Sequence, residues 1–565
     1  MKKILLGLLI VCIPFLCSSQ TEFVLLGGTQ VDLQNAINNL NNSNNGFGTI
    51  TIKGNILIQQ NTNIPPGITL NFYTGNKLIV SNGVSLDIKG SIKALLTQII
   101  ETNELNHKIK IFNQVVYPEW FGECSYQNSL GNNQQDNIPI QKAFNSLIGG
   151  GEIIFNGNEY LINTEINIDT PSIKIKGKGT YSAGNVIAND LVVIDDNISS
   201  VFNITTYGIV FSDLNFTKKN KTVKGINATG KALNFIRSNN TKDIDASVTN
   251  CRFTHFKYCI YGEGANLKIT DSFFGASYIG IYIKEAQFDH NDHKPQTRGH
   301  IIDRNRFHSM GSESNDSSLI GSTCIKIRPK GYAFQTSYTP ESYTVIGYYN
   351  HITNNYVDDC KTFFEGSIDR TKIEGNSILK STDTAIKAFG GLFGAINDNL
   401  IDGAFTWNPN KLYPSKASDS TGQVAFPSGH GIHISYAHFA TINNNQIMNK
   451  RYHGIFVERS KNSSIQSNTI MNFNRHRFIK RSGENPEIND DRNYCGIYIA
   501  KVQDDNPLTN DKYNIQNVIS NNTISITHNK VEGNYGIYVG DGDDWNFVKN
   551  NFIVSTRLIQ SIKIE

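Results

Sequence analysis

The sequence predicts an all-β fold, a single-stranded right-handed parallel β-helix, in which the chain winds into a solenoid of stacked coils. Two repeated patterns carry this prediction. A hexapeptide of the form Ile-x-x-Asn-x-Ile recurs along the chain, and a second motif, Gly-Ile-x-Ile, precedes it in most coils. Self-similarity at a regular period is the sequence signature of a repeat architecture.

The hexapeptide copies share Asn at their fourth position. They are IDRNRF (302–307), ITNNYV (352–357), IEGNSI (373–378), INDNLI (396–401), INNNQI (442–447), IQSNTI (465–470), ISNNTI (519–524) and VKNNFI (548–553). We expect this Asn to adopt a left-handed turn conformation, and its side chain to hydrogen-bond to the equivalent Asn of the next coil. A helical solenoid would need apolar spacings of three and four residues, which are absent.

The second motif fixes the phase of the coil. Its first apolar residue lies ten residues before the next hexapeptide in Ile386 to Ile396, Ile432 to Ile442 and Ile455 to Ile465. This offset predicts two strands per coil, joined by a turn. Within each strand the period is two, so alternate Ile and Val should point inward while the residues between them face solvent.

Length and composition agree with a soluble solenoid. A chain of 565 residues exceeds the size at which a single ordinary core stops growing, but each added coil brings its own core. Charged residues make up 18% and hydrophobic residues 39%, which favours neither disorder nor a membrane bundle. The formal net charge of +3 gives no indication of a nucleic-acid partner.

The chain is expected to divide into three parts. Residues 1–20 have the charged start, apolar stretch and polar end of a secretory signal peptide, with a lipoprotein signal at Cys17 as the alternative. Residues 21–115 are predicted to form an accessory β segment with strands at 49–53, 56–58, 68–72 and 78–80, and residues 116–565 the β-helix domain. No segment is apolar enough to span a bilayer. Cys259, Cys324 and Cys495 fall where other coils have Ala or Gly, so we interpret them as small buried residues.

The start of the β-helix domain resembles a known family. The relevant residues are Tyr117-Pro-Glu-Trp-Phe-Gly122, Ile140-Gln-Lys-Ala-Phe144, Gly149-Gly-Gly-Glu-Ile-Ile154 and Tyr160-Leu-Ile162. They resemble the opening of the pectate-lyase-like superfamily, where a "PEWFGA" segment, a short capping helix and a strand pair begin a right-handed β-helix. Pectate lyases, polygalacturonase-like hydrolases and phage tailspike depolymerases belong to it. The acidic "GDG-x-x-DDT" stretch usual there is degenerate at 122–136, which bears on the subfamily rather than the fold.

Candidate functional residues come from the outward position of the Gly-Ile-x-Ile strands. In register, these residues should form one column on a single face. Aromatic rings suit the faces of sugar rings, and Lys and His suit acidic groups on a sugar, although large side chains also simply cover β surfaces. The expected column is Tyr261, Tyr282, Lys326, Phe364, Lys387, His433, Phe456, Tyr498 and Tyr538.

The next outward position holds Lys284, Arg328, Ser435 and Glu458. Lys284 and Arg328 on neighbouring coils resemble the alginate lyase and chondroitinase B family, in which a strand-end Lys is the base and an Arg on the next coil is the acid. The resemblance implies that Lys284 abstracts the proton α to a carboxylate, provided that neighbouring cations lower its pKa. The alternative is a solvated basic face.

Other motifs are less specific. Gly429-His430-Gly431 repeats a tripeptide of polygalacturonases, but their paired aspartates and R-I-K motif are absent. Asp289-His290-Asn-Asp292-His293 has the composition of a metal site on a loop. Asp541-Gly-Asp-Asp544 is interpreted as a turn or as a surface Ca²⁺ site. No cofactor is required by these patterns, and Ca²⁺ is the metal they would suit.

The sequence thus predicts a secreted enzyme of the periplasm, cell surface or medium that cleaves an acidic polysaccharide by β-elimination, acting as a monomer or homotrimer. Hydrolysis through carboxylates such as Glu365, Asp369, Asp383 or Glu458 is one alternative, and a non-catalytic glycan-binding adhesin is the other. The predicted catalytic residues are Lys284, Arg328 and His433, and the predicted substrate-binding residues are Tyr282, Lys326, Lys387, Phe456, Glu458 and Tyr498.

Overall fold

The computed structural model describes residues 21–112, 114–125, 135–179, 190–222, 225, 227–237, 244–284, 299–310, 322–328, 349–381, 383–403, 429–450, 452–473, 494–500, 516–526, 533–540, 546–554 and 558–564. They group into two compact units. The smaller contains residues up to 114 together with 119–122 and 145–148, and the larger contains the remainder. The predicted signal peptide and both candidate metal loops lie outside the described residues. None of the described helices is long and apolar enough to cross a bilayer.

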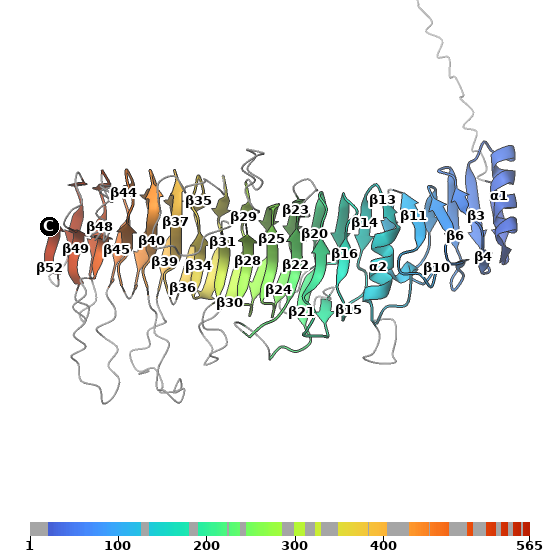
Figure 1. Ribbon diagram of the computed structural model, residues 1–565, viewed down its shortest axis with the longest axis horizontal. Coiled ribbons are helices and arrows are strands. Elements are labelled where there is room, and N and C mark those ends of the chain that lie inside the picture. The colour runs from blue at the N-terminus through green and yellow to red at the C-terminus, as the bar shows by residue number, and fades with distance from the viewer. Residues whose placement is uncertain are drawn as a thin grey trace, which may run out of the picture. The chain divides into compact units, whose positions relative to one another are not determined.

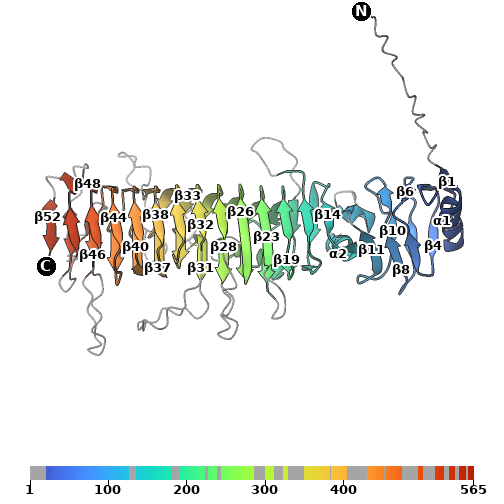
Figure 2. The same cartoon turned by 90° about the horizontal axis from the view of Figure 1, so that it is seen from above.

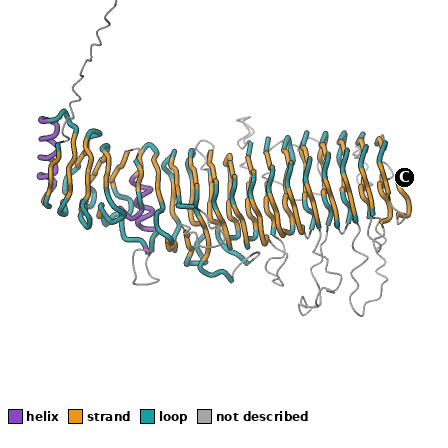
Figure 3. Tube along the Cα trace, turned by 180° about the vertical axis from the view of Figure 1, so that it is seen from behind, coloured by secondary structure: helices purple, strands orange, loops and turns teal. Residues whose placement is uncertain are grey.

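The larger unit is a right-handed parallel β-helix, as predicted. Its described strands form three long sheets in which every pairing is parallel and joins successive coils. Figures 1 and 2 show the strands following one another coil by coil, and Figure 3 shows the short turns between them. We call the three sheets I, II and III.

Sheet I has fourteen described strands and precedes the asparagine turn of each coil. Its strands are β12 (Val115–Val116), β14 (Gly151–Ile154), β17 (Ile173–Lys176), β20 (Ile209–Ser212), β23 (Ile244–Thr249), β26 (Ala265–Thr270), β29 (Ile301–Asp303), β32 (His351–Thr353), β35 (Lys372–Glu374), β38 (Ala395–Asn397), β41 (Thr441–Asn443), β44 (Ser464–Gln466), β47 (Val518–Ser520) and β50 (Phe547–Lys549).

Sheet II has thirteen described strands and follows that turn. Its strands are β15 (Glu159–Ile162), β18 (Asp190–Val193), β21 (Asn215–Lys218), β24 (Arg252–Thr254), β27 (Phe273–Gly275), β30 (Arg306–Met310), β33 (Tyr356–Cys360), β36 (Ser377–Ser381), β39 (Leu400–Asp402), β42 (Gln446–Met448), β45 (Thr469–Met471), β48 (Thr523–Ser525) and β51 (Phe552–Val554).

Sheet III, also with thirteen described strands, carries the Gly-Ile-x-Ile motifs. Its strands are β16 (Ile166–Ile168), β19 (Ser200–Ile204), β22 (Lys231–Ile236), β25 (Tyr258–Glu263), β28 (Ile279–Lys284), β31 (Thr323–Arg328), β34 (Thr362–Gly366), β37 (Ile386–Leu392), β40 (Ile432–His438), β43 (Ile455–Glu458), β46 (Cys495–Ile499), β49 (Gly533–Val539) and β52 (Leu558–Ile564).

Each coil therefore contains three strands, and the prediction of two strands per coil is wrong. The hexapeptide is not one strand but two: Ile396 lies in β38 of sheet I and Ile401 in β39 of sheet II. The chain bends so sharply at the Asn between them that the two halves of the motif pair with different sheets.

The predicted asparagine ladder is confirmed. In the first seven of the eight copies, the side-chain Nδ2 donates to Oδ1 of the Asn one coil further on, over 2.9 to 3.1 Å. The same Oδ1 accepts the backbone N–H of the preceding Asn, and Nδ2 also donates to a backbone carbonyl of the coil before, as Asn445 does to Ile396. These buried amides consequently have both donors and the acceptor satisfied. The ladder consists of Asn305, Asn355, Asn376, Asn399, Asn445, Asn468, Asn522 and Asn551.

The left-handed residue of this turn was predicted one position too late. Positive φ angles belong to the residue before the ladder Asn, as at Asn354 (55°), Asp398 (58°) and Asn444 (57°). The side-chain amide of the ladder Asn itself points into the interior, where it hydrogen-bonds to the ladder Asn residues of the neighbouring coils. Asn, Asp or Gly fills most of the left-handed positions because these residues tolerate that conformation.

The small residue that opens the Gly-Ile-x-Ile motif is required by packing. A Cβ at Gly431 would lie 2.5 Å from Cγ2 of Ile447 and 2.6 Å from the carbonyl oxygen of Gly454. Cys259 and Cys324 occupy this position, and Cys495 directly precedes it at Gly496; all three are fully buried as free thiols, as expected.

The opening of the larger unit matches the expectation drawn from the family resemblance. Helix α2 (Asn137–Ser146) buries Ile140 and Phe144, and the Phe144 ring packs edge-on against Phe202 of β19. Asp136 survives from the degenerate acidic stretch and has a structural role. Its two carboxylate oxygens accept the backbone N–H groups of Ser125 and Leu161.

The smaller unit is itself a short three-sheet parallel β-helix. The predicted strands are present as β3, β4, β6 and β7, but helix α1 (Gln30–Ser43) was not predicted, although Leu33, Ala36, Ile37 and Leu40 have helical spacing and are buried. The strands are β1 (Glu22–Leu25), β3 (Gly48–Ile52), β6 (Ile68–Phe72) and β9 (Ser91–Lys93); β2 (Gly28–Thr29), β4 (Ile56–Ile58), β7 (Leu78–Val80) and β10 (Ile100–Glu101); and β5 (Thr62–Ile64), β8 (Ser85–Ile88), β11 (Lys108–Phe112) and β13 (Leu147–Ile148).

Candidate functional site

The outward column on sheet III exists, with one correction. Register pairs connect Tyr261, Tyr282, Lys326, Glu365, Lys387, His433, Phe456, Tyr498 and Tyr538 from coil to coil. Phe364 was predicted at this position but is fully buried and pairs with Ile325 and Ile386. Phe363 fills the place that Gly, Ala or Cys has in other coils, which moves the outward position to Glu365.

Three acid–base pairs occupy consecutive coils in the middle of this face. Lys326 Nζ lies 2.7 Å from Oε1 of Glu365, Lys387 Nζ lies 2.9 Å from Oδ2 of Asp383, and His433 Nε2 lies 3.0 Å from Oε1 of Glu458. All six side chains are partly buried, with between 14 and 34% of their surface exposed. Partial burial strengthens such pairs relative to fully solvated ones and still leaves them accessible to a ligand.

Glu458 is held in its ionised form. Burial, the largest single effect, raises the pKa of Glu458, but hydrogen bonds from His433 and Ser435 and the charge of Arg459 together outweigh it, so that the pKa lies below its usual value. An ionised carboxylate can only accept hydrogen bonds. His433 must then donate Nε2–H to Glu458, which leaves Nδ1 as the ring nitrogen that is not used in this pair.

Aromatic rings surround His433. Its ring contacts Phe456 at 4.8 Å and His430 at 5.7 Å between centroids, and Phe389 at 6.0 Å. The aromatic surface continues through Tyr498, which stacks on His453 at 4.6 Å, and through Tyr538, which stacks on Tyr498 at 4.9 Å. Aromatic rings thus cover the C-terminal half of the face.

The half-buried His430 and the buried His453 form a second ladder. Nδ1 of His430 accepts the backbone N–H of His453, and Nδ1 of His453 accepts that of Cys495. Burial, together with the nearby cationic groups, holds the pKa of His430 well below its ordinary value, and burial lowers that of His453 to about 3. Both rings are therefore neutral at pH 7 and support the face rather than exchange protons.

Lys450 supports Asp383 from below. Its Nζ donates to the backbone carbonyl of Asp383 at 2.8 Å and to Oγ of Ser381 at 2.9 Å. Burial lowers the pKa of Lys450 to about 8, although the negative charge of Asp383 works in the opposite direction. Neither Lys450 nor His453 was predicted, because nothing in the local sequence distinguishes a buried Lys or His from an exposed one.

The second predicted centre lies further toward the N-terminus. Lys284 and Arg328 are register partners on neighbouring strands, as expected, although only the backbone of Arg328 is described. The charged neighbour seen at Lys284 is not a cation but Glu263, whose Oε1 lies 3.0 Å from Nζ. His433 is four coils away from Lys284, roughly 19 Å at about 4.8 Å per strand. The three predicted catalytic residues therefore share a face but do not form one cluster.

Tyrosines lie close to the Lys284–Glu263 pair. Tyr261 donates its hydroxyl to the other carboxylate oxygen of Glu263 at 3.0 Å, and Lys231 Nζ lies 4.4 Å from the Tyr261 ring centroid. Tyr282 stacks on Tyr258 at 5.4 Å. Burial lowers the pKa of Lys231 and raises that of Tyr261.

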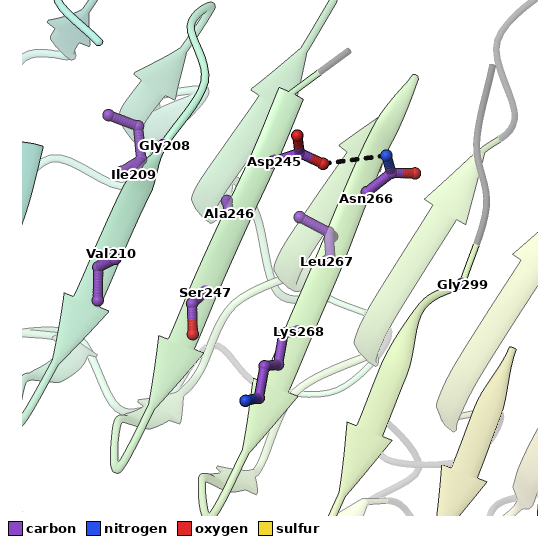
Figure 4. Close-up of a pocket in the computed structure, with 10 residues that line it drawn as sticks. All are labelled: Gly208, Ile209, Val210, Asp245, Ala246, Ser247, Asn266, Leu267, Lys268 and Gly299. Atoms are coloured by element: carbon purple, nitrogen blue, oxygen red, sulfur yellow. Dashed lines mark hydrogen bonds between the residues drawn. The ribbon is translucent and has the colours of Figure 1, made fainter. Parts of the chain in front are cut away.

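Two other features do not contribute to this face. Asp369, one of the alternative carboxylates, is 1% exposed, so it cannot touch a polymer on this face. A shallow hollow of about 350 Å³ lies over β20, β23 and β26 of sheet I (Figure 4). It contains Lys268 and a hydrogen bond from Asn266 to Asp245, but none of the predicted site residues.

Comparisons with known proteins found one family model and several similar solved structures. A family model described as periplasmic copper-binding protein (NosD) matches residues 390–510. Similar solved structures include tailspike protein 3 of bacteriophage CBA120 (12% identity, TM-score 0.46, 80% of this chain and 59% of that chain) and a PL6 alginate lyase in complex with a trisaccharide (13%, 0.47, 80% and 87%). The A-module of mannuronan C-5 epimerase AlgE4 from Azotobacter vinelandii is another (14%, 0.38, 76% and 94%).

The match to the tailspike spans less than two thirds of that protein. No curated protein sequence matches the chain. On the evidence of its own three parallel sheets, the chain is a right-handed parallel β-helix protein, the fold that its resemblance to the pectate-lyase-like superfamily implied.

Proposed function

We propose that the outer face of sheet III binds and cleaves an acidic polysaccharide outside the inner membrane. The observation that carries this proposal is the row of three partly buried acid–base pairs on consecutive coils, continued by stacked rings from Phe456 to Tyr538. Rings bind the apolar faces of sugars, while Lys326 and Lys387 attract carboxylates. The row runs from one coil to the next, along the axis of the solenoid, and an extended polymer would follow the same direction.

We assign the chemistry to His433. With Nε2–H held by Glu458, Nδ1 would take the proton α to a uronate carboxylate, and Lys387 would stabilise the enolate-like charge. The electron pair then forms the carbon–carbon double bond as the glycosidic oxygen leaves. The imidazolium can return the proton to that oxygen, which closes the cycle.

His433→Ala and Lys387→Ala test this assignment. We expect each variant to lower turnover of a uronate polymer by about 10²- to 10⁴-fold, because each removes a group that acts on the reacting atoms. The measurement is the ultraviolet absorbance of the unsaturated product. Lys268→Ala, an exposed lysine on sheet I, is the matched control and should leave turnover unchanged.

The products separate the alternatives. New reducing ends without the absorbance change would indicate a hydrolase that uses Glu365, Asp383 or Glu458, and binding without any product would indicate an adhesin. We propose that Lys284 and Arg328 bind the polymer upstream of the cut. Loss of turnover by orders of magnitude in Lys284→Ala, with unchanged folding, would instead move the catalytic base to Lys284.

Copper binding, which the matching family model names, is not proposed. His430 and His453 stack nearly parallel, with 6° between their planes, and each uses Nδ1 to accept a backbone N–H. Within the described residues, no group of three His, Cys, Asp or Glu side chains is arranged to hold a metal ion.

A further inference from the structure

An exposed column of bulky side chains lies at the corner where the chain passes from sheet III to sheet I. Tyr349, Arg370, Phe393 and Phe439 each stand two residues before a sheet I strand, in four successive coils. The register of β32, β35, β38 and β41 places them in one line. We call these four residues the corner strip.

All four residues of the strip are in the left-handed conformation, with φ angles of 66°, 44°, 60° and 55°. The equivalent residue is Gly299 in the coil before the strip and Asn462 in the coil after it, residue types that adopt this conformation readily. For bulky residues the same conformation is strained. Tyr436, which lies within β40 three residues before Phe439, also has the left-handed conformation, with φ of 54°.

Burial does not offset this strain. The three rings of the strip are among the more exposed aromatic side chains, at 56% for Tyr349, 56% for Phe393 and 45% for Phe439. In the described part of the chain, the Phe and Tyr residues with a positive φ are Tyr349, Phe393 and Phe439 of the strip, and Tyr436 within β40. Large rings that stay exposed in a strained backbone conformation point to a role at the surface, such as binding a ligand.

The chemistry of the strip indicates what that ligand is. Phe393 and Phe439 stack at 5.1 Å with 19° between their planes, and the Arg370 guanidinium lies 5.7 Å from the Tyr349 ring. Arg459 covers the Tyr436 ring at 5.1 Å. Lys461 adjoins the strip, since its carbonyl accepts the Phe439 N–H. Rings interleaved with cations complement sugar rings that carry negative charge.

We propose that the corner strip is a second binding site for acidic polysaccharide, separate from the cleavage face. Phe439 follows His433 by six residues and comes just after the end of β40, so the backbones of the two residues are at most about 20 Å apart at about 3.3 Å per residue. There it would hold a distal part of a long polymer and keep it near the enzyme between cuts. The inference rests on the proposed function for the class of polymer, but it concerns binding and does not require cleavage.

The double variant Phe393→Asn/Phe439→Asn tests the strip. Asn relieves the backbone strain while removing both rings, so we expect the midpoint of thermal unfolding to stay the same or rise. Affinity for polygalacturonate, alginate or hyaluronan, measured by affinity electrophoresis, should fall about ten-fold or more. Turnover of short oligosaccharides should not change. Phe552→Asn, which removes a 66% exposed ring from sheet II, is the control and should keep full affinity.

Arg370→Gln separates charge from stacking, because it should weaken binding of uronate polymers and not that of a neutral glucan. Unchanged polymer affinity in the double variant would overturn the proposal. So would a clear loss of thermal stability, which would make the rings structural, or a change in molecular mass, which would make the strip a contact between copies of the chain. A variant that still binds polymer tightly but does not cleave would concern the proposed function alone.

Discussion

At the scale of single residues, the buried histidine ladder predicts an acid-sensitive fold. The pKa of His453 falls from 6.5 to about 3 on folding because the ring is buried. As the pH drops below 6.5, the unfolded chain binds a proton at His453 and the folded protein does not, so the free energy of unfolding decreases until about pH 3. The loss is on the order of a few kcal/mol.

His453→Asn checks this prediction. Asn keeps an acceptor for the Cys495 N–H but does not titrate in this range, so the variant should lose less stability than the natural protein between pH 7 and pH 4. Urea midpoints at the two pH values measure the difference. Equal losses in both proteins would show that His453 does not contribute to the acid response.

Glu458 gives a second prediction with a different pH window. Its pKa lies below the usual 4.5 despite burial, because His433 and Ser435 hydrogen-bond to its carboxylate. The stabilisation is present above that value and is lost as the pH falls through the depressed pKa. Glu458→Gln should therefore lower stability modestly at pH 7, by about 1 kcal/mol, and the difference should shrink as the pH falls below 4.5. A stability difference that persists unchanged at pH 3 would contradict the ionised pair.

At the scale of the elements, the asparagine ladder should dominate the stability of the turn between sheets I and II. Asn445 is fully buried and makes four side-chain hydrogen bonds, with Asn399, Asn468 and Ile396. Asn445→Ala removes the acceptor of the Asn399 backbone N–H and of one Asn399 side-chain N–H in the interior, and we expect a loss of about 3 kcal/mol or more. Asn551→Ala, at the partly exposed end of the ladder, is the matched control and should cost about 1 kcal/mol. Equal losses at both positions, measured by urea denaturation, would mean that the ladder stabilises each turn independently.

At the scale of the whole molecule, each coil of the larger unit pairs only with the coil before and the coil after it. Stability in such a solenoid is a sum of local terms. The Asn445→Ala variant should therefore speed amide hydrogen exchange in the strands from β38 to β48 and leave exchange in β19 to β26 unchanged. A uniform increase along the chain would show instead that the larger unit unfolds as one cooperative body.

The repeats of this protein could be predicted from the sequence because each one is determined by residues that are close together in the chain. A period of two, an Asn at one turn and a small residue at the start of a strand are each imposed within a few residues, so the β-helix, the ladder and the shared face of Lys326, Lys387, His433 and Phe456 could all be predicted. The number of strands in a coil could not, because a sharp bend and a continuous strand have the same apolar pattern. Phe364 was misplaced for a related reason, since a Phe can fill a position that other coils give to a small residue.

Only the tertiary structure decided which groups meet. Asp383 receives a hydrogen bond from Lys450, 67 residues away, and His453 supports Cys495 across 42 residues, because coils of different length bring distant residues into adjacent strands. Glu263 beside Lys284 and Glu458 beside His433 likewise depend on which side chains stack across a coil boundary. The sequence by itself determined the solenoid and the residue types on its faces. Ion pairs, the burial of side chains and the strained residues at the corners depend on contacts between coils. The spacing of residues along the chain does not predict which side chains make these contacts.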